Sequence, residues 1–220
     1  MCARFRSVRQ LSQLPGFFQV GGAINFEFNP NLAPSESTPI YLTNLDGTRS
    51  VRLASFGIAL AGRPAHARMV NSRTDKLRAG SFKKLLASNR CIIPAEGFYE
   101  WREENGKKQP YYFYRLDAQP ILFAGLWDYS EIKGDKVASF AILTDEPNAV
   151  IAQFHDRMPV ILDDPLAWLE PSDSPLDNIR PLGIDHFGVR PVNPAVNRVS
   201  EKSLEKIEAP IAGISQGVLF

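Results

Sequence analysis

Cysteine and histidine are scarce in this chain of 220 residues, which contains two cysteines, Cys2 and Cys91, and three histidines. Two cysteines are too few for a disulfide framework, and with three histidines they form no spaced set of zinc ligands. No uninterrupted apolar run reaches the ~18 residues that a membrane span needs. The basic, polar start of the chain lacks the apolar segment of a secretory signal peptide. We therefore expect a cytoplasmic protein that binds no membrane, metal or cofactor.

Net charge is also small, at +1 from 25 basic and 24 acidic side chains, but its distribution is uneven. Residues 1–100 carry 13 basic and 6 acidic side chains, a net charge of +7, whereas residues 101–220 carry 12 and 18, a net charge of −6. Within residues 49–90, ten basic side chains accompany a single acid, Asp75. This asymmetry fits a surface that binds a polyanion such as nucleic acid. It fits equally well a solvated basic face that the second half of the chain balances.

Short β-strands joined by tight turns dominate the sequence pattern. The 17 prolines are spread along the chain and favour many short elements over long helices. Asp46-Gly47, Asn105-Gly106 and Lys133-Gly134-Asp135 are typical of hairpin turns. Strands are predicted from alternating or apolar β-rich runs at Tyr41–Leu45, Val51–Leu60, Cys91–Ile93, Pro110–Arg115, Ile121–Tyr129, Val137–Thr144 and Val160–Leu162.

Helix signals are fewer and shorter. A helix is predicted over Ser81–Ser88, where Ser81 would cap the first turn, and another from Asp164-Pro165 onward. A third short helix is predicted over Pro147–Phe154. Together with the strands, these segments predict a mostly β, α+β fold. Because no linker divides the chain, we expect a single domain over residues 1–220.

Cys2 is the most unusual candidate for chemistry. Removal of Met1, which is generally permitted before a small residue, would give Cys2 both an α-amine and a thiol. The amine has an ordinary pKa of about 7.7–8.0, so part of it is neutral at pH 7, and nearby arginine favours the thiolate. Such a residue either uses its amine as the base for its thiol or captures an aldehyde as a five-membered thiazolidine. The alternative is an ordinary buried cysteine.

A carboxylate among aromatic residues is the second candidate. Residues 90–101 form an apolar run that passes a Pro/Gly turn and ends in Phe98-Tyr99-Glu100-Trp101. Alternation in a strand places Phe98 and Glu100 on one face and the other two side chains on the opposite face. An acid in such surroundings is a candidate for a raised pKa and for proton transfer. A salt-bridged strand end is the alternative.

His155 and Asn71 complete the set of candidate polar groups. His155 lies between an apolar segment and a strand, where Asp156 and Arg157 could orient it as a general acid or base. A structural histidine fits the same position. Asn71 follows the apolar Met69-Val70 and either caps a turn or holds an amine or phosphate.

Taken in order, these segments resemble the SRAP family, the SOS response-associated peptidase-like proteins, whose members sense abasic sites in single-stranded DNA and cross-link to them. The resemblance runs from Met1 to about Pro210, which leaves a C-terminal tail from about residue 210 outside the core. The matching motifs are Met1-Cys2-Ala3-Arg4-Phe5, Asn31-Leu32-Ala33-Pro34, Asn71-Ser72-Arg73-Thr74-Asp75, Cys91 to Trp101, Ala124-Gly125-Leu126-Trp127 with Thr144, His155-Asp156-Arg157-Met158-Pro159, and Pro191-Val192 with Asn197.

The resemblance implies a mostly antiparallel, barrel-like β core with peripheral short helices. It also implies a role for each candidate residue. Cys2 would form a thiazolidine with the ring-opened sugar, and Asn71 would orient the α-amine. Glu100 would shuttle protons during imine formation, and His155 would assist ring opening and reversal. Weak AP-lyase activity is expected, because the same imine permits β-elimination.

Five further residues are implied to contact the DNA, and a monomer is expected. Arg4 and Arg73 would grip phosphates, whereas Pro34, Trp101 and Thr144 would line the DNA path. Two alternatives stay open beside this interpretation. One is a peptidase that processes itself through Cys2, with Glu100 and His155 as partners, and the other is a binder of single strands without catalysis.

Three departures from the family pattern bear on DNA binding. Ala3 replaces the glycine beside the nucleophile and adds a Cβ where DNA would approach closely. A tryptophan-rich segment of the family is reduced here to Phe56, so an aromatic wedge between bases would depend on that residue. Asp75 is one methylene shorter than the family's usual glutamate.

Overall fold

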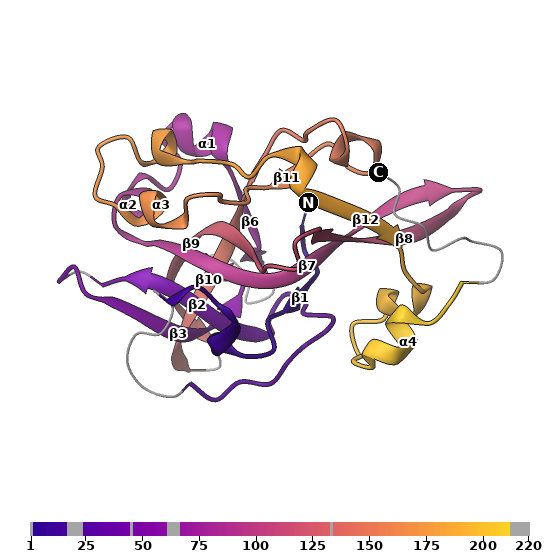
Figure 1. The fold of residues 1–220 in the computed structure, drawn as a ribbon. Helices are drawn as coiled ribbons and strands as arrows, with labels where there is room; N and C mark the ends of the chain where they lie inside the picture. The colour runs from indigo at the N-terminus through magenta and orange to yellow at the C-terminus, as the bar shows by residue number, and fades with distance from the viewer. Residues whose placement is uncertain (1, 17–23, 45, 61–66, 133, 212–220) are drawn as a thin grey trace.

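The computed structural model describes residues 2–16, 24–44, 46–60, 67–132 and 134–211, and β-strands make up most of its regular structure (Figure 1). The strands are β1 (Phe5–Ser7), β2 (Ser37–Thr43), β3 (Arg49–Phe56), β4 (Ile58–Ala59), β5 (Arg68–Met69), β6 (Asn71–Arg73), β7 (Arg90–Glu104), β8 (Lys107–Arg115), β9 (Ile121–Ile132), β10 (Asp135–Asp145), β11 (Met158–Pro159) and β12 (Phe187–Pro191). The α-helices are α1 (Thr74–Arg78), α2 (Lys83–Ser88), α3 (Pro165–Leu169) and α4 (Leu204–Glu208). Short 3-10 helices are η1 (Leu11–Gln13), η3 (Ile151–Gln153), η4 (Pro175–Asn178), η5 (Ile184–His186) and η6 (Pro194–Asn197).

Five strands close into a ring at the centre of the fold. β10 pairs with β3, β3 with β2, β2 with β7, β7 with β9, and β9 again with β10. The sheet continues from β7 through β8 to β12, while β1 pairs with β7, and β6 and β11 pair with β10. Figure 1 shows α1, α2 and α3 on one side of this sheet and α4 at the opposite end. The ring confirms the predicted barrel-like β core with peripheral short helices, although β10 is parallel to β3 and β6.

The predicted hairpin turns join neighbouring strands. Asn105 and Gly106 connect β7 to β8 with φ values of 51° and 72°, the two positive angles that an Asn-Gly turn provides. Gly47 has φ of 80° between β2 and β3, and Gly134 has φ of 88° between β9 and β10. Glycine adopts this left-handed conformation without steric cost, which is why the turn sequences identified these hairpins.

Two predicted strands are shorter than expected. The strand expected over Val51–Leu60 ends at Phe56, because Gly57 has φ of 104° and the chain then pairs separately as β4 with β5. The segment Val160–Leu162 forms isolated bridges rather than a strand. Its apolar residues are buried, and its backbone still bonds to β9 and β10, since the Leu162 N–H donates to the Leu122 carbonyl oxygen and the Val160 N–H to the Leu143 carbonyl oxygen, both at 2.9 Å.

The helix predictions have mixed outcomes. Asp164 caps α3 as predicted, because its side chain accepts the Ala167 N–H at 3.1 Å. The predicted serine cap of α2 is wrong, since Phe82 occupies the cap position without a side-chain hydrogen bond. The helix expected over Pro147–Phe154 is a single 3-10 turn, η3. None of the described helices is long and apolar enough to cross a membrane.

Phenylalanine rings fill the interior of the strand ring. Phe5 of β1 contacts Phe56 and Phe123 with ring centroids 5.5 and 5.9 Å apart, and Phe56 stacks on Phe140 at 5.0 Å. All four rings are completely buried, and each contributes about 1.5–3 kcal/mol to stability. Since Phe5 is held at this centre, the residues that precede it are carried into the core as well.

Candidate active site

Strand β1 places Cys2 beside the middle of β7. Phe5 pairs with Phe98, and the Tyr99 N–H donates to the Arg4 carbonyl at 3.0 Å. Because β1 and β7 are antiparallel, the chain that runs back from Phe5 to Cys2 follows β7 forward toward Glu100. Cys2 is 0% exposed, and its burial, together with the negative charge of Glu100, raises the pKa of its thiol far above the ordinary value. The structure thus favours a protonated thiol.

Asn71 reaches the same place from β6. Its Nδ2 donates to the Cys2 carbonyl oxygen at 2.8 Å and to the Val70 carbonyl oxygen at 3.0 Å. Its Oδ1 is buried and accepts no hydrogen bond from the described residues. Buried polar atoms are usually paired, so the side chain offers one further acceptor next to the Cys2 backbone.

Glu100 lies on the core side of β7, as the alternation predicted. Phe98 belongs to the central apolar cluster, whereas Tyr99 and Trp101 belong to a cluster on the outer face. Burial raises the pKa of the Glu100 carboxyl to about 7, and the nearby charge of Asp156 also raises it. A carboxyl with this pKa both donates and accepts protons near neutrality.

His155 is held in the turn between η3 and β11. Its Nδ1 accepts the Arg157 N–H at 3.0 Å and lies 2.8 Å from Oδ1 of Asp156. Burial lowers the pKa of His155, although the charge of Asp156 opposes this shift. The turn lies close to β7, because the ring of Phe154, the residue before His155, has its centre 5.0 Å from the Arg102 guanidinium.

The four candidate catalytic residues are therefore brought together from the segment before β1, from β6 and β7, and from the turn before β11. Asn71 contacts Cys2 directly, and Glu100 acts on it electrostatically. Asp156 connects His155 to Glu100 through its charge. Their chemical roles stay predictions. Among the described residues, no cluster of three or more histidine, cysteine or acidic side chains could hold a metal ion.

A basic cluster lies next to these residues at the end of β10. Arg73 pairs with Thr144 of β10 in register and donates to both oxygens of Asp75, at 3.0 and 2.8 Å. Arg157 donates to the Thr144 carbonyl oxygen at 2.6 Å and lies 3.6 Å from Asp75. The sequence marks Arg157 only as a neighbour of His155. Its partner Asp75 lies far away along the chain, so no local pattern indicates the pair.

Arg4 is buried instead of exposed to a ligand. Its Nε donates to Oδ1 of Asn31 at 2.9 Å, and its Nη2 donates to the Val196 carbonyl oxygen. Its guanidinium also lies 5.9 Å from the centre of the Trp101 ring, and the indole N–H of Trp101 donates to Oδ1 of Asn197 at 2.7 Å. The phosphate contact expected of Arg4 stays a prediction, whereas in this structure the side chain ties β1 to the segment at η6.

Asn31, which no sequence pattern marks as a site residue, joins the loop before β2 to the segment around η6. Its Nδ2 donates to the carbonyl oxygens of Val196, Arg198 and Glu201 at 3.0–3.1 Å. These partners lie more than 160 residues along the chain, so no local pattern predicts them. Pro34, three residues further on, is partly exposed at the edge of the same loop.

The interpretation of Phe56 as a base-separating wedge is wrong. Its ring is 0% exposed and stacks on Phe140 inside the strand ring. The hydrophobic core holds this side chain, because Phe56 is the last residue of β3 and its ring points inward. Residues 61–66, at the end of the segment that differs from the family's tryptophan-rich pattern, lie outside the described residues.

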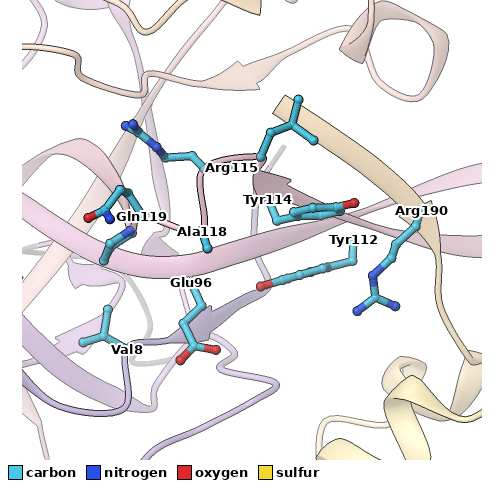
Figure 2. A pocket seen from close by; sticks show the side chains of 10 residues that line it. Val8, Glu96, Tyr112, Tyr114, Arg115, Ala118, Gln119 and Arg190 are labelled. Carbon is cyan, nitrogen blue, oxygen red and sulfur yellow. The ribbon is translucent and has the colours of Figure 1, made fainter. Parts of the chain in front are cut away.

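A pocket of about 560 Å³ lies on the outer face of β7 and β8, away from the candidate catalytic residues. Figure 2 shows Glu96, Tyr112, Tyr114 and Arg190 around it. The two tyrosine rings stack with centroids 5.8 Å apart. Because Cys2 and Glu100 belong to the opposite side of β7, this pocket is not part of the candidate active site.

Comparison with known proteins identifies the family to which the chain is similar. The SOS response associated peptidase (SRAP) family matches residues 1–199 of the chain. Abasic site processing protein YoqW of Bacillus subtilis (strain 168) is 31% identical over 95% of this chain and 100% of its own length. Abasic site processing protein YedK of Escherichia coli (strain K12) is 32% identical over 64% of this chain and 67% of its own length.

A solved structure has the same fold. A crystal structure of a protein from Bordetella bronchiseptica superposes with a TM-score of 0.74 at 23% identity, covering 87% of this chain and 100% of that one. At this identity the likeness concerns the fold alone. The family match extends over the residues that meet at Cys2, from β1 to the turn before β11. The chain belongs to the SRAP family.

Proposed function

We propose that this protein processes abasic sites in single-stranded DNA by forming a covalent thiazolidine through Cys2. The names of its relatives YoqW and YedK, abasic site processing proteins, support the substrate. The observation that carries the proposal is the hydrogen bond of 2.8 Å from Asn71 to the Cys2 carbonyl, next to the buried Glu100. Removal of Met1 would convert the Cys2 nitrogen from a peptide nitrogen into an amine at this position.

The reaction begins with attack of the Cys2 amine on the aldehyde carbon of the ring-opened deoxyribose. The resulting carbinolamine loses its hydroxyl as water, which needs a proton donor, and leaves an imine. The thiol sulfur then adds to the imine carbon, and the thiol proton moves to the nitrogen. One C–N bond and one C–S bond form, one water leaves, and no oxidant or reductant is required.

Glu100 and Asn71 fit the proton transfers and the orientation that these steps need. With a pKa of about 7, the Glu100 carboxyl donates a proton to the departing hydroxyl and accepts one back near neutral pH. The buried Oδ1 of Asn71 is an acceptor for an N–H of the Cys2 amine, which would turn the lone pair toward the aldehyde. The thiol of Cys2, held protonated by burial, adds only after the imine has formed.

His155 would act on the sugar instead of on the amine. Its lowered pKa leaves the imidazole neutral near pH 7, so it accepts the hydroxyl proton when the sugar ring opens. The same group returns a proton when the adduct reverses. Proton removal from the sugar at the imine stage would give β-elimination, which accounts for the weak AP-lyase activity that we propose.

Mass spectrometry of the intact adduct tests this function. Protein incubated with single-stranded DNA carrying one abasic site should gain the mass of the oligonucleotide minus one water, on a chain that lacks Met1. Cys2→Ser keeps the amine but lacks the thiol, so it should give only an imine that borohydride must trap. Cys91→Ala removes the other fully buried cysteine and should leave the adduct unchanged.

Two results would contradict the proposal. One is the absence of any adduct with the parent chain from which Met1 has been removed. The other is a heat-stable adduct that persists in Cys2→Ser, because a second nucleophile would then be responsible. Retention of Met1 in Glu100→Ala alone would favour the self-processing peptidase.

A further inference from the structure

The burial of Phe56 leaves open which aromatic ring could stack on a base of the bound strand. Among the described residues, two aromatic side chains are strongly exposed, Phe82 at 40% and Tyr129 at 39%. Tyr129 already has cationic partners, since Lys136 lies 4.5 Å from its ring centre and Arg52 donates to its hydroxyl at 2.7 Å. No stacking or cation–π contact to Phe82 is found in the described part of the chain. The exposed part of its ring is therefore not already engaged by another ring or cation among these residues.

Phe82 lies in the tight turn between α1 and α2. Its backbone is left-handed, with φ of 52° and ψ of 32°, a conformation that bulky side chains rarely adopt. The preceding Gly80 also has positive φ, 93°. The turn therefore exposes an aromatic ring on a strained backbone. Because the ring is not part of the core, core packing does not explain this strain. Strain of this kind is often found at functional positions.

Positively charged residues flank Phe82 along the chain. Lys83 and Lys84 follow Phe82 directly, and the α1 helix contributes Lys76 and Arg78, all four of them exposed. No acidic residue occurs between Asp75 and Glu96. Among the described residues, Asp177 lies 3.1 Å from Arg78, and Asp173 lines the same pocket as Lys83. Aromatic rings interleaved with cations form the usual platform for single-stranded nucleic acid, in which bases stack on the rings and phosphates meet the cations.

This surface is continuous with the candidate active site. β6, which carries Asn71 and Arg73, leads without interruption into α1 at Thr74. The α1 helix has five residues and a length of about 7.5 Å. Figure 1 shows α1 beyond the end of β6, and α2 follows it on the same side of the sheet, beside α3. A strand held at Arg73 thus needs only a few further nucleotides to reach Phe82.

We propose that Phe82 is a stacking platform for a base of the DNA strand that flanks the abasic nucleotide, with Lys83 and Lys84 at its phosphates. The inference rests on the proposed function for its substrate, and it assigns a binding site outside the catalytic group. Stacking of a base on an aromatic ring tolerates any base, so this contact would hold the strand without reading its sequence.

Two substitutions separate the ring from the backbone. Phe82→Asn removes the ring, and asparagine tolerates the left-handed conformation better than other side chains except glycine, so the turn should be preserved. Phe82→Tyr keeps the ring. Tyr129→Asn removes the other exposed aromatic ring and is the matched control. Thermal denaturation of each variant reports whether the fold is retained.

Binding of an undamaged oligothymidine of about 16 nucleotides, a long site for single-strand binders, is measured by fluorescence anisotropy. Phe82→Asn should bind about tenfold more weakly, near the low end of the cost of losing one stacked base. Phe82→Tyr and Tyr129→Asn should bind like the parent. Cross-link rates are then compared on the long oligonucleotide and on a minimal one with a single nucleotide on each side of the abasic site, where Phe82→Asn should react like the parent.

Unchanged binding in Phe82→Asn would overturn the inference, and so would an equal loss in Tyr129→Asn. A loss on the minimal oligonucleotide as large as on the long one would show that Phe82 acts on the catalytic group instead of on flanking bases. If the parent binds the long oligonucleotide but forms no adduct, the proposed function fails, while the binding comparison still decides the role of Phe82.

Discussion

At the scale of single residues, Glu100 combines burial with the proton-transfer role that we propose for it. Its carboxyl is buried on the core side of β7, which raises its pKa to about 7, compared with an ordinary value of 4.5. Alternation along residues 98–101 predicted which face it occupies, and the flanking aromatic residues suggested the raised pKa. The sequence could not indicate that Asp156 contributes, because that contact joins β7 to a turn more than 50 residues away.

Glu100→Gln should separate stability from activity through pH. The folded protein keeps the Glu100 proton up to about pH 7, whereas the unfolded carboxyl releases it near 4.5. The free energy of unfolding of the parent therefore falls as the pH rises through this window. The glutamine variant lacks this term, so at pH 8 it should be more stable by up to about 3 kcal/mol. Chemical denaturation at several pH values measures the difference.

At pH 4 the stabilities of parent and variant should converge, because both side chains are then neutral. The rate of adduct formation at pH 7 should nevertheless fall about a hundredfold in the variant, since a general acid and base is lost. A stability difference that does not change between pH 4 and pH 8 would contradict the raised pKa of Glu100.

At the scale of elements, β7 is the strand on which the site depends, and the sequence predicted only part of it. The run Cys91–Ile93 was expected as a short strand, but β7 extends over 15 residues, Arg90–Glu104. Pro94 and Gly97 suggested a turn in the middle. Both are accommodated within the strand, because Pro94 pairs with Leu122 of β9 and Gly97 lies between β1 and β8. A shift of register between Arg6 and Ser7 absorbs the irregularity. Such tertiary pairing is not visible in a local pattern.

Gly97→Ala should destabilise the protein because β7 and β8 approach closely at this position. A Cβ at Gly97 would lie 2.5 Å from the Tyr112 ring, and the Phe113 carbonyl oxygen would be closer still. Overpacking of this kind costs about 3 kcal/mol. Gly16→Ala is the control, since a Cβ there would meet no atom within 4 Å. A similar melting temperature for both variants would contradict the close packing of the two strands.

At the scale of the whole molecule, the hairpin turns and the α+β class were predictable, whereas the closure of the ring was not. Each turn contains a glycine with positive φ, so local chemistry marks it. The closure depends on the parallel pairing of β10 with β3, whose residues lie more than 80 positions apart. The meeting of Cys2, Asn71, Glu100 and His155 is likewise a product of topology, and the family resemblance indicated it where pattern alone did not.

The uneven charge of the chain leads to a prediction about salt. If residues 1–100, with a net charge of +7 from 13 basic and 6 acidic side chains, supply the contacts to phosphate, binding of an undamaged strand should weaken steeply as salt rises. Four phosphate contacts would lower the affinity about 10- to 100-fold between about 50 and 200 mM salt. Anisotropy titrations measure this dependence. The adduct, once formed, should survive high salt, and its dissociation by salt alone would show that it is not covalent.

The shortness of β6 has a consequence for local dynamics. Three residues, Asn71–Arg73, pair with β10, and α1 follows them at once. A ladder this short opens at a lower free energy than the 15-residue β7 on the other side of the site. Backbone amides of β6 should therefore exchange with deuterium sooner than those of β7, so the wall that holds Asn71 and Arg73 loosens well before the rest of the molecule unfolds.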